Sequence, residues 1–325
     1  MIKRTIEISG QGMHLSIEQS NLIVKRDARQ VGHVPVEDVG VLILDNPGAT
    51  YTHAVLTELL AAGAVIVPCG RNHHPCALFL PQENTLQTQR VLAQARAGLP
   101  LRKNLWKQVV QAKLTNQAAV LPEGSSGRET LQALAAKVRS GDPDNIEGQA
   151  AKLYWSAFGG FAGAVECGGA SLRGSAAAIR RESAQSAQSA DVFRRHREGP
   201  PPNNLLNYGY VVMRAAVARA ICGAGLHPSL GLHHKSQYNS FCLADDLLEP
   251  LRPLVDRKVL AMRGAWGPEL TREMKAELLT LLTAEIEVAG EKGPLMVALT
   301  RMTASLVRCY EGQSRTLELP TLGDA

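Results

Sequence analysis

The spacing of apolar residues changes once along this 325-residue chain, near Thr88, and that change limits the folds open to it. Before this point the apolar residues form short runs rich in β-branched side chains, several of them alternating, as in NLIVKR. Beyond it they recur at helical intervals, as in LWKQVVQAKL. Alternation predicts half-buried strands, and a period near 3.6 predicts amphipathic helices. The sequence therefore predicts an α+β protein with a strand-rich first part and a helical second part.

The first part, residues 1–85, is expected to form a compact, β-sandwich-like domain. Strands are predicted at TIEIS, LSIEQ, NLIVKR, VGVLIL, AVIVPC and CALFLP, because Gly, Asn, Asp and Pro separate these runs. One helix interrupts them at THAVLTELLAAG, where the final glycine suits a C-cap.

The second part, residues 86–325, is expected to be a larger all-α domain. Helices are predicted within VLAQARAGLPLRKNLWKQVVQAKLTNQAAVL, ETLQALAAKVRSG, NIEGQAAKLYWSAF, NLLNYGYVVMRAAVARAICGAG, LADDLLEPLRPLVDRKVLAM, TREMKAELLTLLTAEIEVAG and PLMVALTRMTASLVRCYEG. Between the third and fourth of these segments, a stretch rich in Ser, Ala, Gln and Arg ends in three prolines, which is typical of a loop. Its arginines either bind phosphates or form a solvated surface.

Composition excludes few functions. The net charge of +5 is compatible with a polyanionic partner but is common without one, and 4% aromatic residues argue against base stacking as the main mode of nucleic-acid recognition. The start has no apolar signal-peptide core and no apolar run is long enough to span a bilayer, so we expect a cytoplasmic protein without membrane contact. The six cysteines form no CxxC pair, which indicates reduced thiols. Nucleophile-elbow, P-loop and dinucleotide motifs are absent.

Glu147 in NIEGQAAKLYW allows two interpretations. Asp144 or Asn145 is suited to cap the helix that begins here, which places Glu147 in the first turn, where an acid complements the helix dipole. The alternative is a metal ligand.

In the PPPNNLLNYGYVVMRAAV stretch, Tyr208 and Tyr210 lie beside small residues, which favours buried packing over stacking on nucleic acid.

The stretch GLHHKSQYNSFCLADDLLEP carries a second group of polar side chains. Asp246 and Glu249 are three residues apart and share a face if the segment is helical, whereas Asp245 points elsewhere. A loop histidine, His233 or His234, would complete with Glu147 a mixed oxygen and imidazole set suited to Mn²⁺ or Mg²⁺. Acids at a helix start are also common without a metal, so a capped helix remains the alternative.

Several stretches resemble, in order and spacing, the catalytic integrase subunit of CRISPR adaptation. They are NIEGQAAKLYW, PPPNNLLNYGYVVMRAAV, and GLHPSLGLHH followed by FCLADDLLEPLRPLVD. The runs LSIEQSNLIVKR, VPVEDVGVLILDN and VIVPCGRNHHPCALFLP are similar to the β-domain of that family. Each motif is weak alone, but their ordered combination is specific and covers nearly the whole chain. The resemblance is strongest to the form that accompanies type II systems.

The resemblance implies a metal site with named ligands. In this family a glutamate, a histidine and an acidic residue bind a divalent metal, and the motifs place them at Glu147, His234 and Glu249. His234 is preferred over His233 because the family's PxLGxxH pattern ends there. Asp246 falls on a position that is also acidic in relatives and in some helps to hold metal. The cofactor implied is Mg²⁺ or Mn²⁺.

The resemblance also implies an activity and partners. The family's enzyme is a metal-dependent DNA endonuclease and integrase of antiviral defence, in which the 3′-hydroxyl of a short protospacer attacks a phosphodiester at the edge of the CRISPR repeat. Implied partners are double-stranded DNA, a second copy bound through the β-domain, a small ferredoxin-like subunit and, in type II systems, the RNA-guided effector nuclease. Basic residues expected to meet the DNA backbone are Lys235, Arg252, Arg257, Lys258, Arg194 and Arg195.

Two other functions remain open at this stage. One is a non-catalytic DNA-binding scaffold of the adaptation complex, in which the acids are structural. The other is a metal-dependent nuclease that acts on RNA. The Ser/Ala/Gln-rich segment from about Ser171 to Ser189 has no clear alignment with the family, which leaves its contacts with DNA open.

Overall fold

The order of elements confirms the predicted α+β class. The structure, a computed structural model, describes residues 3–70, 76–81, 87–163, 193, 195–196 and 199–323. The N-terminal elements are β1 (Arg4–Ile8), β2 (Met13–Glu18), β3 (Asn21–Arg26), β4 (Arg29–Pro35), β5 (Val39–Leu44), β6 (Thr50–Tyr51), α1 (His53–Ala61) and β7 (Val65–Pro68). The helical part comprises α2 (Gln87–Arg96), α3 (Leu99–Val120), α4 (Ser126–Lys137), α5 (Ile146–Gly163), α7 (Asn203–Gly223), α8 (Cys242–Leu248), the 3-10 turn η2 (Glu249–Leu251), α9 (Arg252–Ala261), α10 (Arg272–Leu279) and α11 (Leu295–Tyr310).

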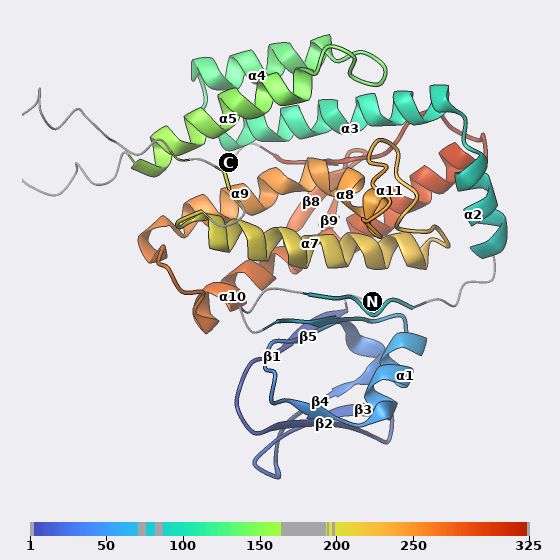
Figure 1. Ribbon diagram of the computed structural model, residues 1–325, viewed down its shortest axis with the longest axis vertical. Helices are drawn as coiled ribbons and strands as arrows, with labels where there is room; N and C mark the ends of the chain where they lie inside the picture. Colours follow the sequence, from blue (N-terminus) through green and yellow to red (C-terminus); the bar gives the residue numbers. More distant parts are fainter. Residues whose placement is uncertain are drawn as a thin grey trace, which may run out of the picture.

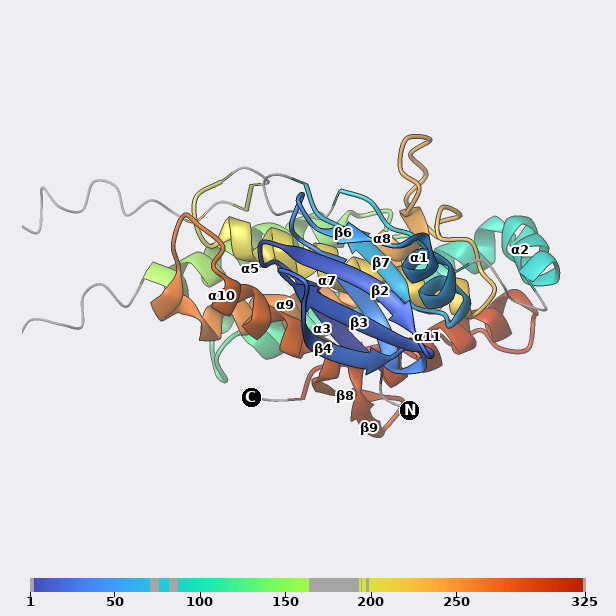
Figure 2. The ribbon, with the colours of Figure 1, turned by 90° about the horizontal axis from the view of Figure 1, so that it is seen from below.

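The N-terminal part is a sandwich of two sheets. One sheet is parallel, with strand order β1–β5–β7, and the other has the order β4–β3–β2–β6. The hairpins β2–β3 and β3–β4 turn through two successive residues with positive φ, Gln19–Ser20 and Asp27–Ala28. Such turns match the right-handed twist of the strands they join. In Figure 2, β2, β3 and β4 form the outer sheet, in front of α7.

Strand β5 is buried along its whole length because both faces of its sheet are covered. Leu42 and Leu44 pack toward the second sheet and α1, whereas Val41 and Ile43 belong to the core of the helical part. A strand buried on both faces reads as a continuous apolar run, which explains VGVLIL. The β domain therefore rests on the helices through its parallel sheet, as Figure 1 shows.

Helix α7 is the centre of the helical part. It contacts α8, α9, α10 and α11, and most of its residues are buried. Gly209 allows α9 to approach closely, since a Cβ there would lie 2.5 Å from Val255 Cγ1. Helix α3 packs across α4, α5, α8 and α9, so it spans the two groups of helices that carry the predicted acids (Figure 1).

The structure corrects the expectation that the second domain is helical throughout. A three-stranded sheet of β10 (Pro320–Thr321), β8 (Glu285–Val288) and β9 (Glu291–Pro294) lies within it. The helix predicted over TREMKAELLTLLTAEIEVAG thus ends at Leu279. The EIEV run alternates and is followed by Ala289 and Gly290, both with positive φ, so a hairpin forms instead of a further helical turn.

In the β domain, one strand prediction was wrong and strand β4 was missed. CALFLP forms only an isolated bridge between Phe79 and Ile66, while RQVGHVP, which was not predicted, is β4. Strand β4 contains Gly32 and several polar residues and does not alternate between apolar and polar positions, so its sequence pattern does not predict this edge strand. The expected domain boundary between residues 85 and 86 remains a prediction, since residues 82–86 lie outside the described residues. Residues 171–189 also lie outside them.

Candidate active site

Glu147 lies in the first turn of α5, as the sequence predicted. Asn145 caps the helix by accepting a hydrogen bond from the Gly148 amide at 3.2 Å. A second cap was not predicted: the Asp142 carboxylate accepts from the amides of Ile146 and Glu147 at 2.9 and 3.0 Å. These caps satisfy amides that a helix start leaves without partners, and so fix the position from which Glu147 projects.

Glu249 begins a break in the helix predicted over LADDLLEPLRPLVDRKVLAM. Pro250 and Pro253 lack the N–H of a continuous helix, and the chain passes through the 3-10 turn η2 between α8 and α9. Glu249 is buried, and its Oε1 accepts a hydrogen bond from Arg252 Nε at 2.8 Å. The regular helix is therefore interrupted at the buried Glu249.

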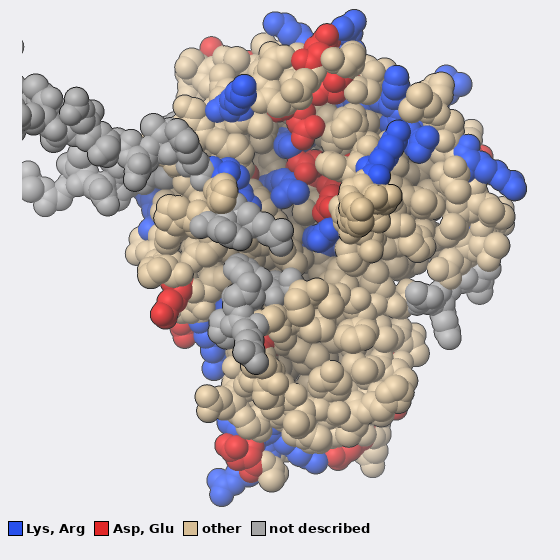
Figure 3. Space-filling view, viewed as in Figure 1, with Lys and Arg blue, Asp and Glu red and all other residues tan. Residues whose placement is uncertain are grey.

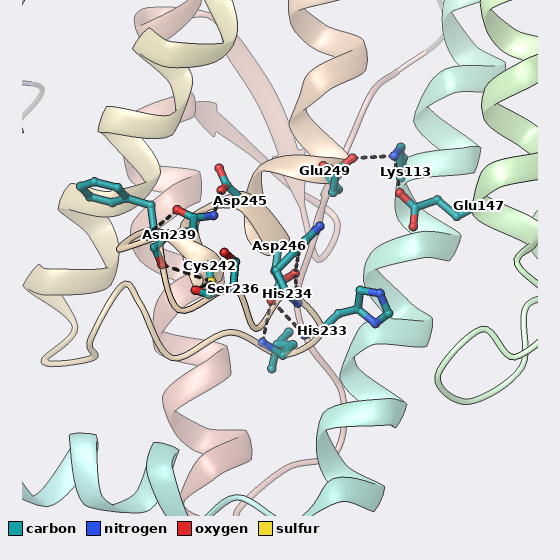
Figure 4. A network of polar contacts seen from close by, with 12 residues as sticks. Lys113, Glu147, His233, His234, Ser236, Asn239, Cys242, Asp245, Asp246 and Glu249 are labelled. Atoms are coloured by element: carbon teal, nitrogen blue, oxygen red, sulfur yellow. Dashed lines mark hydrogen bonds and ion pairs between the residues drawn. The ribbon is translucent and has the colours of Figure 1, made fainter. Parts of the chain in front are cut away.

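Lys113 of α3 joins the two glutamates (Figure 4). Its Nζ lies 2.6 Å from Glu147 Oε1 and 2.5 Å from Glu249 Oε2. Burial disfavours the ammonium, but the two carboxylates outweigh this effect and raise the pKa of Lys113. Burial also opposes ionisation of Glu249, yet the charges of Lys113 and Arg252 lower the pKa of that carboxyl to about 2. Lys113 and Glu249 are therefore both charged at neutral pH.

Asp246 organises the loop that carries the two histidines. Its Oδ2 accepts hydrogen bonds from the amides of Leu232 and His233 at 2.6 and 3.0 Å, and its Oδ1 accepts from the His234 amide at 3.3 Å. Oδ1 also lies 2.6 Å from His234 Nδ1. Gly231 makes this arrangement possible, because a Cβ there would lie 2.4 Å from the His234 carbonyl oxygen and 2.8 Å from Asp246 Oδ2.

The Asp246 bond orients the His234 imidazole. The hydrogen bond to Asp246 raises the pKa of His234 and uses Nδ1, which leaves Nε2 for another partner. The His234 side chain is 45% exposed, so solvent reaches part of it. Asp245 points elsewhere, as predicted, where it pairs with Arg214 at 2.8 Å.

Helix α3 also supports the histidines. Trp106 stacks on His233 with ring centroids 4.4 Å apart, and meets His234 edge-on at 5.9 Å. Trp106 and Lys113 are seven residues apart, so they lie on one face of α3. Sequence analysis missed both residues. The available signal was a lysine placed among the apolar positions of this helix, in VVQAKL.

A buried carboxylate lies behind the site. Asp256 of α9 accepts hydrogen bonds from Tyr154 of α5, at 2.8 Å, and from Tyr210 of α7. The guanidinium of Arg252 lies over the Tyr210 ring, 4.7 Å from its centroid. The network thereby links α5, which carries Glu147, to α7 and α9. Tyr208 and Tyr210 are both buried, which confirms the prediction.

Most of the basic residues expected to contact DNA are engaged within the chain. Arg252 pairs with Glu249, Lys258 with Glu277, and Arg257 donates to the Gly323 carbonyl at 3.1 Å. Arg195 donates to Asn203 and Asn207 at 2.9 and 2.6 Å. Arg194 lies outside the described residues.

Lys235 is exposed and lines a pocket of about 520 Å³ beside His234. Arg102 lines the same pocket, and its Nε is buried without a hydrogen-bond partner among the described residues. On the face shown in Figure 3, acidic and basic side chains gather over the helical part, with blue atoms on either side of a red strip.

The donor set fits a hard divalent cation. Two carboxylates and a free imidazole nitrogen are ligands that Mg²⁺ or Mn²⁺ accepts. Glu249 Oε2 is buried, and although the Lys113 ammonium is close, the contact lacks hydrogen-bond geometry. Across the described ranges, however, no three side chains of His, Cys, Asp or Glu are grouped so that they could hold one ion. The Lys113 ammonium lies between the two glutamates.

The fold and this cluster define a class: a β sandwich attached to a helical domain that gathers two glutamates and an Asp–His pair. Residues 6–266 match the family described as CRISPR associated protein Cas1. The chain belongs to the Cas1 family.

Relatives extend over nearly the whole chain. A CRISPR-associated endonuclease Cas1 from Neisseria meningitidis is 32% identical to this chain. The match covers 96% of this chain and 94% of that relative. One from Pyrobaculum aerophilum is 24% identical over 93% of this chain and 98% of its own. Among solved structures, a casposase bound to integration product has a TM-score of 0.72 at 19% identity, covering 97% of this chain and 92% of its own. A Cas1 protein from Thermotoga maritima has a TM-score of 0.70 at 17% identity, and the match covers 96% of this chain and 98% of that chain. These two structures share the fold. None of the described helices is long and apolar enough to cross a membrane.

Proposed function

We propose that this protein is a metal-dependent DNA endonuclease and integrase that inserts short DNA into a CRISPR array. In the reaction, the 3′-oxygen of the incoming strand bonds to phosphorus at the edge of the repeat, and the bond from that phosphorus to its original 3′-oxygen breaks. The observation that carries the proposal is that Glu147 and Glu249, from separate segments of a Cas1-family chain, meet at one ammonium, that of Lys113.

The residues have distinct roles in this proposal. Glu147 and Glu249 would hold Mg²⁺ or Mn²⁺, which supplies Lewis-acid stabilisation of charge on the phosphate when bound. His234 would direct Nε2 to the same place. Asp246 is proposed as a positioning residue, because its oxygens already accept bonds from the loop. Lys235 and Arg102 would contact the DNA backbone without reading sequence.

Partners follow from the family and stand as proposals. Double-stranded DNA is the substrate, and a second copy of the chain binds through the β domain. One solved neighbour is a Cas6-RT-Cas1–Cas2 complex, which supports a small ferredoxin-fold subunit as a further partner here. A type II RNA-guided effector nuclease is a further proposed partner, and we expect the complex in the cytoplasm.

The test is integration of labelled DNA with the small partner subunit in Mn²⁺ or Mg²⁺. Glu147→Ala, His234→Ala and Glu249→Ala should each abolish the joined product, at least about a hundredfold, because each removes a group from the reacting centre. Glu123→Ala is the matched control, since Glu123 is an exposed acid in the loop after α3. Near-normal joining by one of the three, with its fold intact by circular dichroism, would remove the role given to that residue.

One observation favours a second function. Glutamates neutralised by Lys113 and Arg252 are also what a structural ion-pair network contains, which suits a non-catalytic DNA-binding scaffold. Chelation separates the two functions. Joining that survives EDTA would favour the scaffold, with the chemistry residing in another protein.

A further inference from the structure

Lys113 occupies the space that a cation shared by Glu147 and Glu249 would take. One ammonium contacts a carboxylate oxygen of each residue, at 2.6 and 2.5 Å. Both separations are shorter than the range of about 2.7–2.9 Å for ordinary charge-assisted N–H···O contacts. The lysine side chain is 11% exposed and reaches the site from α3, so that its ammonium lies between the two carboxylates (Figure 4). A divalent ion that bound both carboxylate oxygens would have to occupy the position of this ammonium. The ion and the ammonium therefore exclude each other.

The charges of the cluster balance without any added ion. Glu147 and Glu249 carry two negative charges, and Lys113 and Arg252 carry two positive ones. A buried charge is stable only with a partner, so removing the ammonium from the carboxylates leaves a cation that needs another anion. Under the proposed function, a DNA phosphate is the anion that would pair with this ammonium.

We propose that Lys113 is an internal cation that makes metal binding at this cluster depend on DNA. The inference rests on the proposed function, because it takes Glu147 and Glu249 as the metal-holding residues. Without DNA, the ammonium competes for the two carboxylates and the metal binds weakly. With DNA, the displaced ammonium pairs with the phosphate backbone. Metal and DNA then strengthen each other's binding, as linkage requires. The device would keep the protein from holding a reactive metal when no DNA is present.

Calorimetric titration of Mn²⁺ into the full chain tests this coupling. The DNA is a duplex with 3′-dideoxy ends, which binds but cannot be joined. In the wild-type protein, DNA should tighten Mn²⁺ binding by about tenfold or more. Lys113→Met should bind Mn²⁺ about tenfold more tightly than wild type without DNA, and DNA should then add less than about threefold.

Lys152→Met is the matched control, because Lys152 is an exposed lysine on the helix that carries Glu147. It should leave the Mn²⁺ affinity without DNA unchanged. If Lys113→Met binds Mn²⁺ no more tightly than wild type, the inference is overturned while the proposed function stands. If wild type binds no Mn²⁺ even with DNA, both are overturned.

Thermal melting covers the case in which Lys113→Met is unstable. Lys113→Gln serves as the second variant, since its amide retains hydrogen bonding without charge. Both variants should melt below wild type in EDTA, because two carboxylates lose their cation. Mn²⁺ should raise their melting temperatures more than it raises that of wild type. If the melting temperatures of the variants lie below that of wild type by the same margin with and without Mn²⁺, Lys113 is only a structural partner and the inference is overturned.

Discussion

At the scale of the residue, the role of a carboxylate depends on what its oxygens already contact. Asp246 and Glu249 look equivalent in the sequence, three residues apart, yet the structure gives them different partners. Asp246 is committed to three backbone amides and an imidazole. Glu249 faces cations and keeps a buried oxygen without a well-aligned hydrogen bond. We therefore expect Glu249 to bind an ion and Asp246 to hold the loop.

Asp256 gives a pH prediction at the same scale. Burial raises the pKa of this carboxyl from 3.8 to about 6, against the lowering effect of the hydrogen bonds from Tyr210 and Tyr154. The folded protein thus binds this proton more tightly than the unfolded chain, so the contribution of Asp256 to stability falls as pH rises from about 4 to about 6. A rise from 3.8 to about 6 corresponds to at most about 3 kcal/mol.

Asp256→Asn removes this titration while keeping an oxygen that accepts from one or both tyrosines. Between pH 4 and pH 7, wild type should lose about 1–3 kcal/mol of unfolding free energy relative to the Asn variant. Urea denaturation at a series of pH values measures the difference. If the difference in unfolding free energy between wild type and the Asn variant stays constant across that pH range, Asp256 does not titrate there.

At the scale of the element, α3 connects parts of the chain that are far apart in sequence. Asn116 Nδ2 donates to the carbonyls of Pro250 and Pro320 at 2.7 and 2.9 Å, and Oδ1 accepts from the Leu322 amide at 3.0 Å. One buried amide thereby holds η2, next to Glu249, and the C-terminal strand β10. Tyr154 and Asp256 link α5 to α9 in the same way.

Asn116→Leu keeps the volume but leaves buried backbone groups without partners, so it should cost about 2–4 kcal/mol of unfolding free energy. The Leu322 amide should also exchange its hydrogen faster. Asn104→Leu is the control on the same helix, because Asn104 donates to the Arg315 carbonyl at an exposed position, and should cost less than about 1 kcal/mol. Equal losses for the two variants would contradict the role given to Asn116.

At the scale of the whole molecule, a buried ion pair joins the β domain to the helical domain. Asp45, just after β5, lies 2.5 Å from Lys275 of α10, and the side chains are 0% and 4% exposed. The Lys275 ammonium also lies over the Tyr208 ring of α7, 5.9 Å from its centroid. The two domains thus share a buried charge pair as well as apolar contacts, which favours a fixed relation between them.

Lys275→Met should destabilise the protein by about 3–5 kcal/mol, because it leaves the Asp45 carboxylate buried without this cation. The double variant Asp45→Asn with Lys275→Met should recover most of that loss. Denaturant unfolding of the single and double variants forms the required cycle. A double variant as unstable as Lys275→Met would show that the pair contributes through packing alone.

Local patterns in the sequence were enough for the class of fold, the capped start of α5 and the separation of Asp245 from Asp246, because helical and strand periods depend on near neighbours. Ordered motifs were enough for the family. The sequence could not identify Lys113 or Asn116, whose contacts join residues from distant parts of the chain. Nor could it show that Arg252, Arg257 and Lys258 are engaged within the protein. Which charges meet is decided by long-range packing, and only the tertiary structure placed an ammonium between the two glutamates.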